Sequence, residues 1–106
     1  MVRILRLMSD YHCFPLWEYT DDGDLYDNVN PDDLPLTNEL KSALHAWADA
    51  YDRTLNQEYP PESGFASPEE EAFEAEGRRL WRELQAQLGP EYKVVYYSIR
   101  ENRVLE

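Results

Sequence analysis

The chain has 106 residues and a net charge of −12 at pH 7, and 42% of its residues are hydrophobic, among them three Trp, eight Tyr and three Phe. This length provides for one domain, residues 1–106, with a single modest core, and the hydrophobic content excludes a disordered chain. The negative charge excludes nucleic acid and anionic membranes as partners, because their phosphates would be repelled, and it leaves a basic protein or a cation.

The first part of the chain predicts strands and turns. Residues 2–8 alternate between two faces and contain β-branched side chains, which is typical of a strand. Residues 14–19 predict a second short strand, and the Asp-Gly-Asp run at residues 22–24 predicts a turn after it. Pro31 and Pro35 then keep the backbone extended up to the first helix.

Two amphipathic helices are predicted in the middle of the chain. The first covers roughly residues 37 to 56, with Thr37 as its N-cap and apolar residues at helical spacing. The second begins with the capping box at residues 67–70, where a Ser is followed by a Pro and by a Glu at the third helical position. Gly89 and Pro90 end this second helix.

The C-terminal part predicts a strand and a short hairpin. Residues 92–99 are rich in Val and Tyr and have the highest strand propensity in the chain. Residues 100–103 can turn the chain back so that Val104 and Leu105 pair with that strand. We therefore expect an α+β fold, in which a small antiparallel sheet from the N- and C-terminal strands carries both amphipathic helices on one face.

The acidic segment, from Leu7 to Leu40, contains no Lys or Arg but nine carboxylates and five aromatic side chains. A cationic partner would relieve the repulsion among these carboxylates, and the aromatics would add contact area that loses its water on binding. The alternative is a solvated loop whose aromatics hold it against the core. Trp17 lies outside any helical stripe and is expected to contact a partner, whereas Trp47 and Trp81 are expected in the core. The predicted partner-binding residues are Asp10, Tyr11, Trp17, Glu18, Tyr19, Asp21, Asp22, Asp24, Tyr26, Asp27, Asp32 and Asp33.

A calcium site is the next candidate within the acidic segment. Four side chains fall at the first, third, fifth and twelfth positions of a calcium-binding loop: Asn28, Asn30, Asp32 and Glu39. Asp33, however, stands where such a loop needs Gly, and no helix precedes it. An Asx-rich turn is the better interpretation, and we expect no metal and no cofactor.

The remaining polar residues do not predict catalysis. His12 and Cys13 are adjacent, so in an extended chain their side chains point to opposite faces and cannot form a thiol–imidazole pair. His45 lies one turn before Asp49, where an ordinary surface pair is expected, and two histidines do not make a zinc site. Paired catalytic carboxylates need a deep cleft that so short a chain rarely builds. We therefore expect a protein that is not an enzyme.

The compartment follows from the cysteine count and from hydropathy. Cys13 is the only cysteine, which excludes an intramolecular disulfide and indicates a reducing compartment. The apolar run at the N-terminus is too short for a signal peptide, and no stretch approaches the ~20 apolar residues of a membrane span. We expect a cytoplasmic protein.

Several runs resemble a group of small bacterial proteins: residues 4–17, Leu34-Pro35-Leu36, residues 47–52 and Gly64-Phe65. In size, charge and compartment the chain also resembles the small acidic immunity proteins encoded beside polymorphic and contact-dependent growth inhibition toxins. This resemblance implies a cytoplasmic protein that binds and neutralises the C-terminal toxin domain of a cognate effector, often a basic nuclease. A nucleic-acid mimic that inhibits a DNA-binding protein, or a small enzyme of unknown type, are the alternatives.

Overall fold

The computed structural model describes residues 2–20, 22, 24–54 and 67–106, without the side chains of residues 25, 26, 67 and 68. Its elements follow one another as β1 (Arg3–Leu7), β2 (Leu16–Tyr19), β3 (Leu25–Val29), the 3-10 turn η1 (Pro31–Asp33), α1 (Asn38–Asp52), α2 (Ser67–Leu88), the 3-10 turn η3 (Gly89–Glu91), β4 (Tyr92–Ser98) and β5 (Arg103–Leu105).

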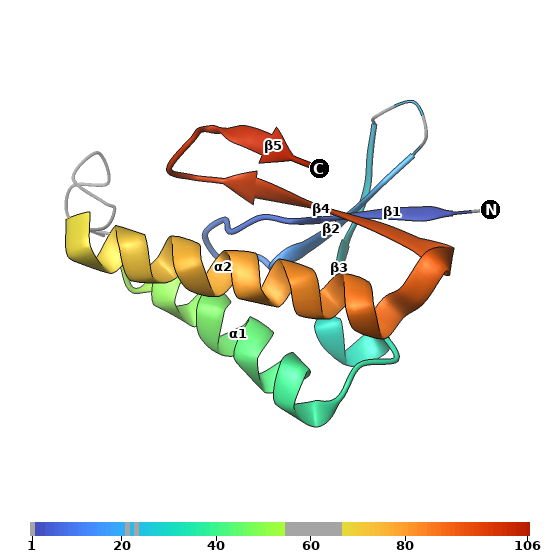
Figure 1. Ribbon diagram of the computed structural model, residues 1–106, viewed down its shortest axis with the longest axis horizontal. Helices are drawn as coiled ribbons and strands as arrows, with labels where there is room; N and C mark the ends of the chain where they lie inside the picture. Colours follow the sequence, from blue (N-terminus) through green and yellow to red (C-terminus); the bar gives the residue numbers. More distant parts are fainter. Residues whose placement is uncertain (1, 21, 23, 55–66) are drawn as a thin grey trace.

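The strands form a five-stranded sheet in the order β3-β2-β1-β4-β5. Figure 1 shows α1 and α2 on the same side of this sheet, so the predicted α+β class is confirmed. The sheet is not purely antiparallel, however, because β1 and β4 pair in parallel. The prediction was wrong on this point for a topological reason: two helices connect β3 to β4, and so long a connection lets β4 enter beside β1 in the same direction.

Strand β3 was not predicted, and the end of α1 was placed too late. The β3 sequence Leu-Tyr-Asp-Asn-Val contains Asp and Asn, which are depleted in strands, but it pairs with β2 along its length. Helix α1 ends at Asp52 instead of residue 56, and the Thr54 hydroxyl binds the Tyr51 carbonyl at 2.6 Å just beyond that end. Residues 55 and 56 lie outside the described part of the chain.

The core lies between the helices and one face of the sheet. Leu5 and Leu7 of β1 are fully buried, and they stand beside Val94 and Tyr96 of the parallel strand β4. The predicted helical stripes are confirmed by the burial of Leu40, Leu44, Trp47 and Ala48 in α1 and of Phe73, Leu80, Leu84 and Leu88 in α2. The predicted N-cap of α1 is confirmed as well, because the Thr37 hydroxyl accepts the Leu40 N–H at 3.2 Å.

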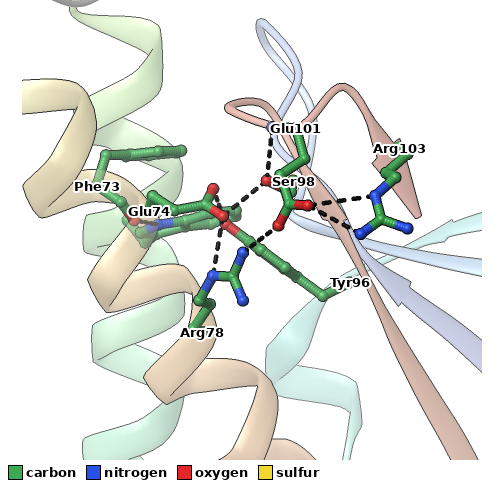
Figure 2. A network of polar contacts seen from close by, with 8 residues as sticks. Phe73, Glu74, Arg78, Tyr96, Ser98, Glu101 and Arg103 are labelled. Atoms are coloured by element: carbon green, nitrogen blue, oxygen red, sulfur yellow. Dashed lines mark hydrogen bonds and ion pairs between the residues drawn. The ribbon is translucent and has the colours of Figure 1, made fainter. Parts of the chain in front are cut away.

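A buried carboxylate fastens α2 to the C-terminal hairpin, as Figure 2 shows. Glu74 is 4% exposed and accepts hydrogen bonds from the Tyr96 hydroxyl at 2.9 Å, from the Ser98 hydroxyl at 2.7 Å and from Arg78 at 3.0 Å. Arg78 also binds Glu101 in the turn before β5 at 2.6 Å. Because three donors surround the Glu74 carboxylate, its charge is compensated despite its burial.

Candidate functional site

Ion pairs are distributed unevenly over the described residues. Most Lys and Arg partners belong to α2, β4, β5 and the turn between those strands, where the pairs are Arg78–Glu74, Arg78–Glu101, Arg79–Glu76, Lys93–Glu106, Arg103–Glu101 and Arg100–Glu71. In the acidic segment the described part of the chain shows a pair with Arg only at Glu18. The other carboxylates of the segment therefore keep most of their charge uncompensated.

Glu18 is occupied by the protein itself. Its carboxylate accepts two hydrogen bonds from Arg3, at 2.8 and 2.7 Å, and Arg3 also donates to the Tyr92 hydroxyl at 2.9 Å. These hydrogen bonds from Arg3 hold the pKa of Glu18 below its ordinary value against the opposing effect of burial. Glu18 thus ties β2 to β1 in the free protein.

Trp17 and Tyr19 lie on the face of the sheet that the helices do not cover. In the strand register, Trp17 stands beside Arg6, which alternates with the inward-facing Leu5 and Leu7. Trp17 is only 8% exposed, and its indole N–H donates to the Met8 carbonyl at 3.0 Å. The Arg6 guanidinium lies over the Tyr19 ring, 4.1 Å from its centre. Trp17 therefore offers a partner little surface in the free protein.

The turn after β1 presents Asp10 and Tyr11 beside the end of α1. The Tyr11 ring stacks on Tyr51 with their centres 4.6 Å apart, and the two hydroxyls of Tyr11 and Thr54 lie 2.9 Å apart. The Asp10 carboxylate accepts the Tyr11 N–H at 2.8 Å and stays exposed. These contacts attach the start of the acidic segment firmly to α1.

The remaining predicted residues are spread over β3 and the turns on either side of it. Asp22 and Asp24 are exposed in the β2–β3 connection, Asp27 is exposed on β3, and Asp32 and Asp33 are exposed on η1. Asp21 and the Tyr26 side chain lie outside the described residues. The structure brings Glu18, Asp27 and Asp33 together in the wall of a cleft of about 380 Å³, called the β3 cleft below, which Phe14 and Asn28 also line.

A second cleft of about 380 Å³ lies between the Asp10–Pro15 turn and α1, and sequence reasoning missed it. This α1 cleft is lined by His12, Phe14, Asn28, His45, Asp49 and Asp52, among others. Asp49 and Asp52 are three residues apart, so the sequence alone places them on the same side of α1. Their approach to Phe14 depends on tertiary packing and has no sequence signal.

Metal and thiol chemistry find no support in these clefts. Across residues 2–20, 22, 24–54 and 67–106, no group of three or more His, Cys, Asp or Glu side chains is arranged to hold a metal ion. His45 pairs with Asp32 at 3.1 Å instead of with Asp49, which corrects the predicted surface pair. Burial, and after it the charges of Asp10 and Asp52, raise the pKa of the Cys13 thiol, which disfavours a reactive thiolate.

The predicted calcium ligands are used elsewhere. The Asn28 side chain binds the backbone of Phe14 and Leu16, and the Asn30 side chain caps η1 by accepting the Asp32 N–H at 3.0 Å. In the part of the chain that the structure describes, neither helix is long and apolar enough to cross a membrane.

Comparison with known proteins places the chain in a family. A family model described as Serratia CdiI immunity protein-like matches residues 3–99. No curated protein matches the chain. The matched range contains the acidic segment, both helices and the strands from β1 to β4.

Proposed function

The chain belongs to the Serratia CdiI immunity protein-like family, and we propose that it neutralises a basic toxin domain by binding it through the acidic segment. The family fixes the coarser function: the chain is an immunity protein of contact-dependent growth inhibition, which neutralises a toxin and is not an enzyme. The resemblance predicted from size and charge is thus confirmed. The basic character of the toxin, its nuclease activity, the cytoplasmic location and the binding surface are our proposals.

The uneven distribution of ion pairs carries the proposal of a basic partner. Five carboxylates of α2 and the C-terminal hairpin have Arg or Lys partners: Glu71, Glu74, Glu76, Glu101 and Glu106. The exposed aspartates of the acidic segment have none among the described residues. A cationic surface would relieve their mutual repulsion and would be steered to this side of the molecule. The proposed contact residues are the exposed ones: Asp10, Asp22, Asp24, Asp27, Asp32 and Asp33.

A nuclease domain suits this surface because a nuclease binds the phosphates of its substrate with cationic groups. Exposed carboxylates at the position of phosphates would occupy such groups directly or would cover them from the side. The family match favours a toxin over a host DNA-binding protein as the partner, so the nucleic-acid mimic loses its support.

Protection of growing cells tests the proposed function. The toxin domain encoded beside this chain is expressed from an inducible promoter, with and without the chain, and the purified pair is examined by isothermal titration calorimetry. We expect that growth is restored and that the two proteins bind tightly. A toxin domain that is neither bound nor neutralised by the chain would overturn the proposal, and a toxin domain without a basic surface would overturn its electrostatic part.

A further inference from the structure

Phe14 is an exposed aromatic residue of the acidic segment, and its backbone is held firmly. The residue is 39% exposed, and among the described residues only Val2 is a comparably exposed large hydrophobic residue. The Asn28 amide accepts the Phe14 N–H at 3.0 Å and donates to the Phe14 carbonyl at 2.8 Å. Asn28 also donates to the Leu16 carbonyl at 3.0 Å. The ring therefore projects from a backbone that β3 fixes on both sides.

Phe14 also separates two acidic clefts. It lines the β3 cleft together with Asp27 and Asp33, and it lines the α1 cleft together with Asp49 and Asp52. The β3 cleft contains a cation of its own, because Arg3 lines it and binds Glu18. No Lys or Arg among the described residues lines the α1 cleft, and none pairs with its two aspartates.

The α1 cleft is built before a partner arrives. Asp52 accepts the backbone N–H of His12 at 3.0 Å, and His12 has a φ of 61°, a left-handed conformation that a residue with a side chain adopts only when its surroundings hold it there. The Phe14 ring approaches the His45 ring edge-on, with their centres 6.3 Å apart. A cleft with fixed walls binds at a smaller entropic cost than one that must be ordered on binding.

We infer that Phe14 anchors the toxin and that an arginine or lysine side chain of the toxin occupies the α1 cleft. The cation lies against the carboxylates of Asp49 and Asp52, and the aliphatic stem or the guanidinium plane packs on the Phe14 ring. This occupant follows from charge complementarity: the cleft carries two carboxylates without a Lys or Arg partner in the described part of the chain and an aromatic wall, which together fit a long cationic side chain. The inference rests on the proposed function and adds α1 to the binding surface.

Matched pairs of variants test this inference against the cognate toxin domain. Phe14→Ala is compared with Val2→Ala, which removes the other exposed hydrophobic side chain, and Asp49→Asn is compared with Glu91→Gln, which removes one exposed charge on η3. We expect about a tenfold or greater rise in Kd for Phe14→Ala and for Asp49→Asn, and less than about a twofold rise for each control. Melting temperatures within about 2 °C of the parent protein establish that each variant is folded.

Alanine variants of the arginines and lysines of the toxin domain identify the occupant. In double-mutant cycles, one of them is expected to couple with Asp49→Asn. The rise in Kd for the two changes together should then be smaller, by a factor of at least about three, than the product of the two single rises. If the parent chain binds the toxin while Phe14→Ala and Asp49→Asn behave like their controls, or if no cation of the toxin couples with Asp49, the inference is wrong and the proposed function stands. If the parent chain does not bind the toxin, the proposed function itself fails.

Discussion

At the scale of single residues, Glu74 and Gly77 of α2 both lie against Tyr96 of β4. The Glu74 carboxylate is buried and depends on donors from α2 and β4, so its removal leaves Tyr96, Ser98 and Arg78 without their shared acceptor. Gly77 lies one turn later, where a side chain would collide with the Tyr96 hydroxyl and the Trp47 ring. The absence of a side chain at Gly77 lets the Tyr96 hydroxyl reach Glu74.

We expect Glu74→Ala to lower the free energy of unfolding by about 2 to 4 kcal/mol, because it strands two buried hydroxyls and one arginine. Urea unfolding measures the effect. The control is Glu83→Ala, a change on the same helix at an exposed carboxylate that forms no ion pair within the described residues, for which we expect less than about 0.5 kcal/mol. Equal losses in the two variants would show that the Glu74 network contributes nothing.

Gly77→Ala is expected to destabilise the protein by about 1 to 3 kcal/mol, although Ala has a higher helix propensity than Gly by about 1 kcal/mol. The reason is the collision with the Tyr96 hydroxyl and the Trp47 ring. The cost should fall in a Tyr96→Phe background, where the nearest colliding atom is absent. A stabilising effect of Gly77→Ala in chemical denaturation would contradict this close approach.

At the scale of the elements, the two faces of the sheet differ in what covers them. The helices cover the face that carries Leu5 and Leu7, whereas Trp17 lies on the other face and is nevertheless only 8% exposed. The Arg3–Glu18 pair joins β1 to β2 at the end of the sheet. The burial of Trp17 and the Arg3–Glu18 pair therefore both contribute to the stability of the free protein.

Trp17→Ala is therefore expected to destabilise the chain by about 3 kcal/mol, as for a buried aromatic residue. Trp47→Ala in α1 should cost a similar amount or more, since the Trp47 ring stacks on Phe73 in the core. Thermal and urea unfolding of the two variants measure these losses. A Trp17→Ala protein as stable as the parent would contradict this structural role and would favour the partner contact that the sequence predicts for Trp17.

The Arg3–Glu18 pair predicts a pH dependence. The pKa of Glu18 is lowered in the folded chain, so the pair stabilises the protein above the ordinary pKa of a glutamate, and this contribution disappears as the pH falls through the lowered value. The parent should exceed Glu18→Gln in stability at neutral pH, and the difference should approach zero in acid. Urea unfolding of both proteins across this range checks it, and a difference independent of pH would contradict it.

The sequence predicts the individual helices and strands better than it predicts which of them pair or pack together. Both helices and four strands follow from apolar spacing, from the Thr37 cap and from the Val- and Tyr-rich run of β4. Strand β3 has no such pattern. It is held in part by the Asn28 side chain, which binds the Phe14 backbone, and a contact of this kind leaves no signal in the local sequence. The parallel pairing of β4 and the approach of Asp49 to Phe14 join residues far apart in the chain, and no local pattern encodes them.

At the scale of the whole molecule, the net charge of −12 is divided into a paired and an unpaired part. The Arg and Lys residues of α2, β4 and β5 compensate neighbouring carboxylates, while the acidic segment and the end of α1 expose theirs. Exposed carboxylates without cationic partners produce a negative field, which accelerates encounter with a cationic protein and is screened by salt. The family supplies the partner, a toxin, and the charge distribution supplies the proposed direction of approach.

Stopped-flow association of the chain with its cognate toxin domain, from about 50 to about 500 mM salt, tests electrostatic capture by the acidic segment most directly. The expected result is a fall of about tenfold or more in the association rate constant across this range, with a much smaller change in the dissociation rate constant. An association rate constant that does not change with salt would contradict capture of the toxin by the acidic segment.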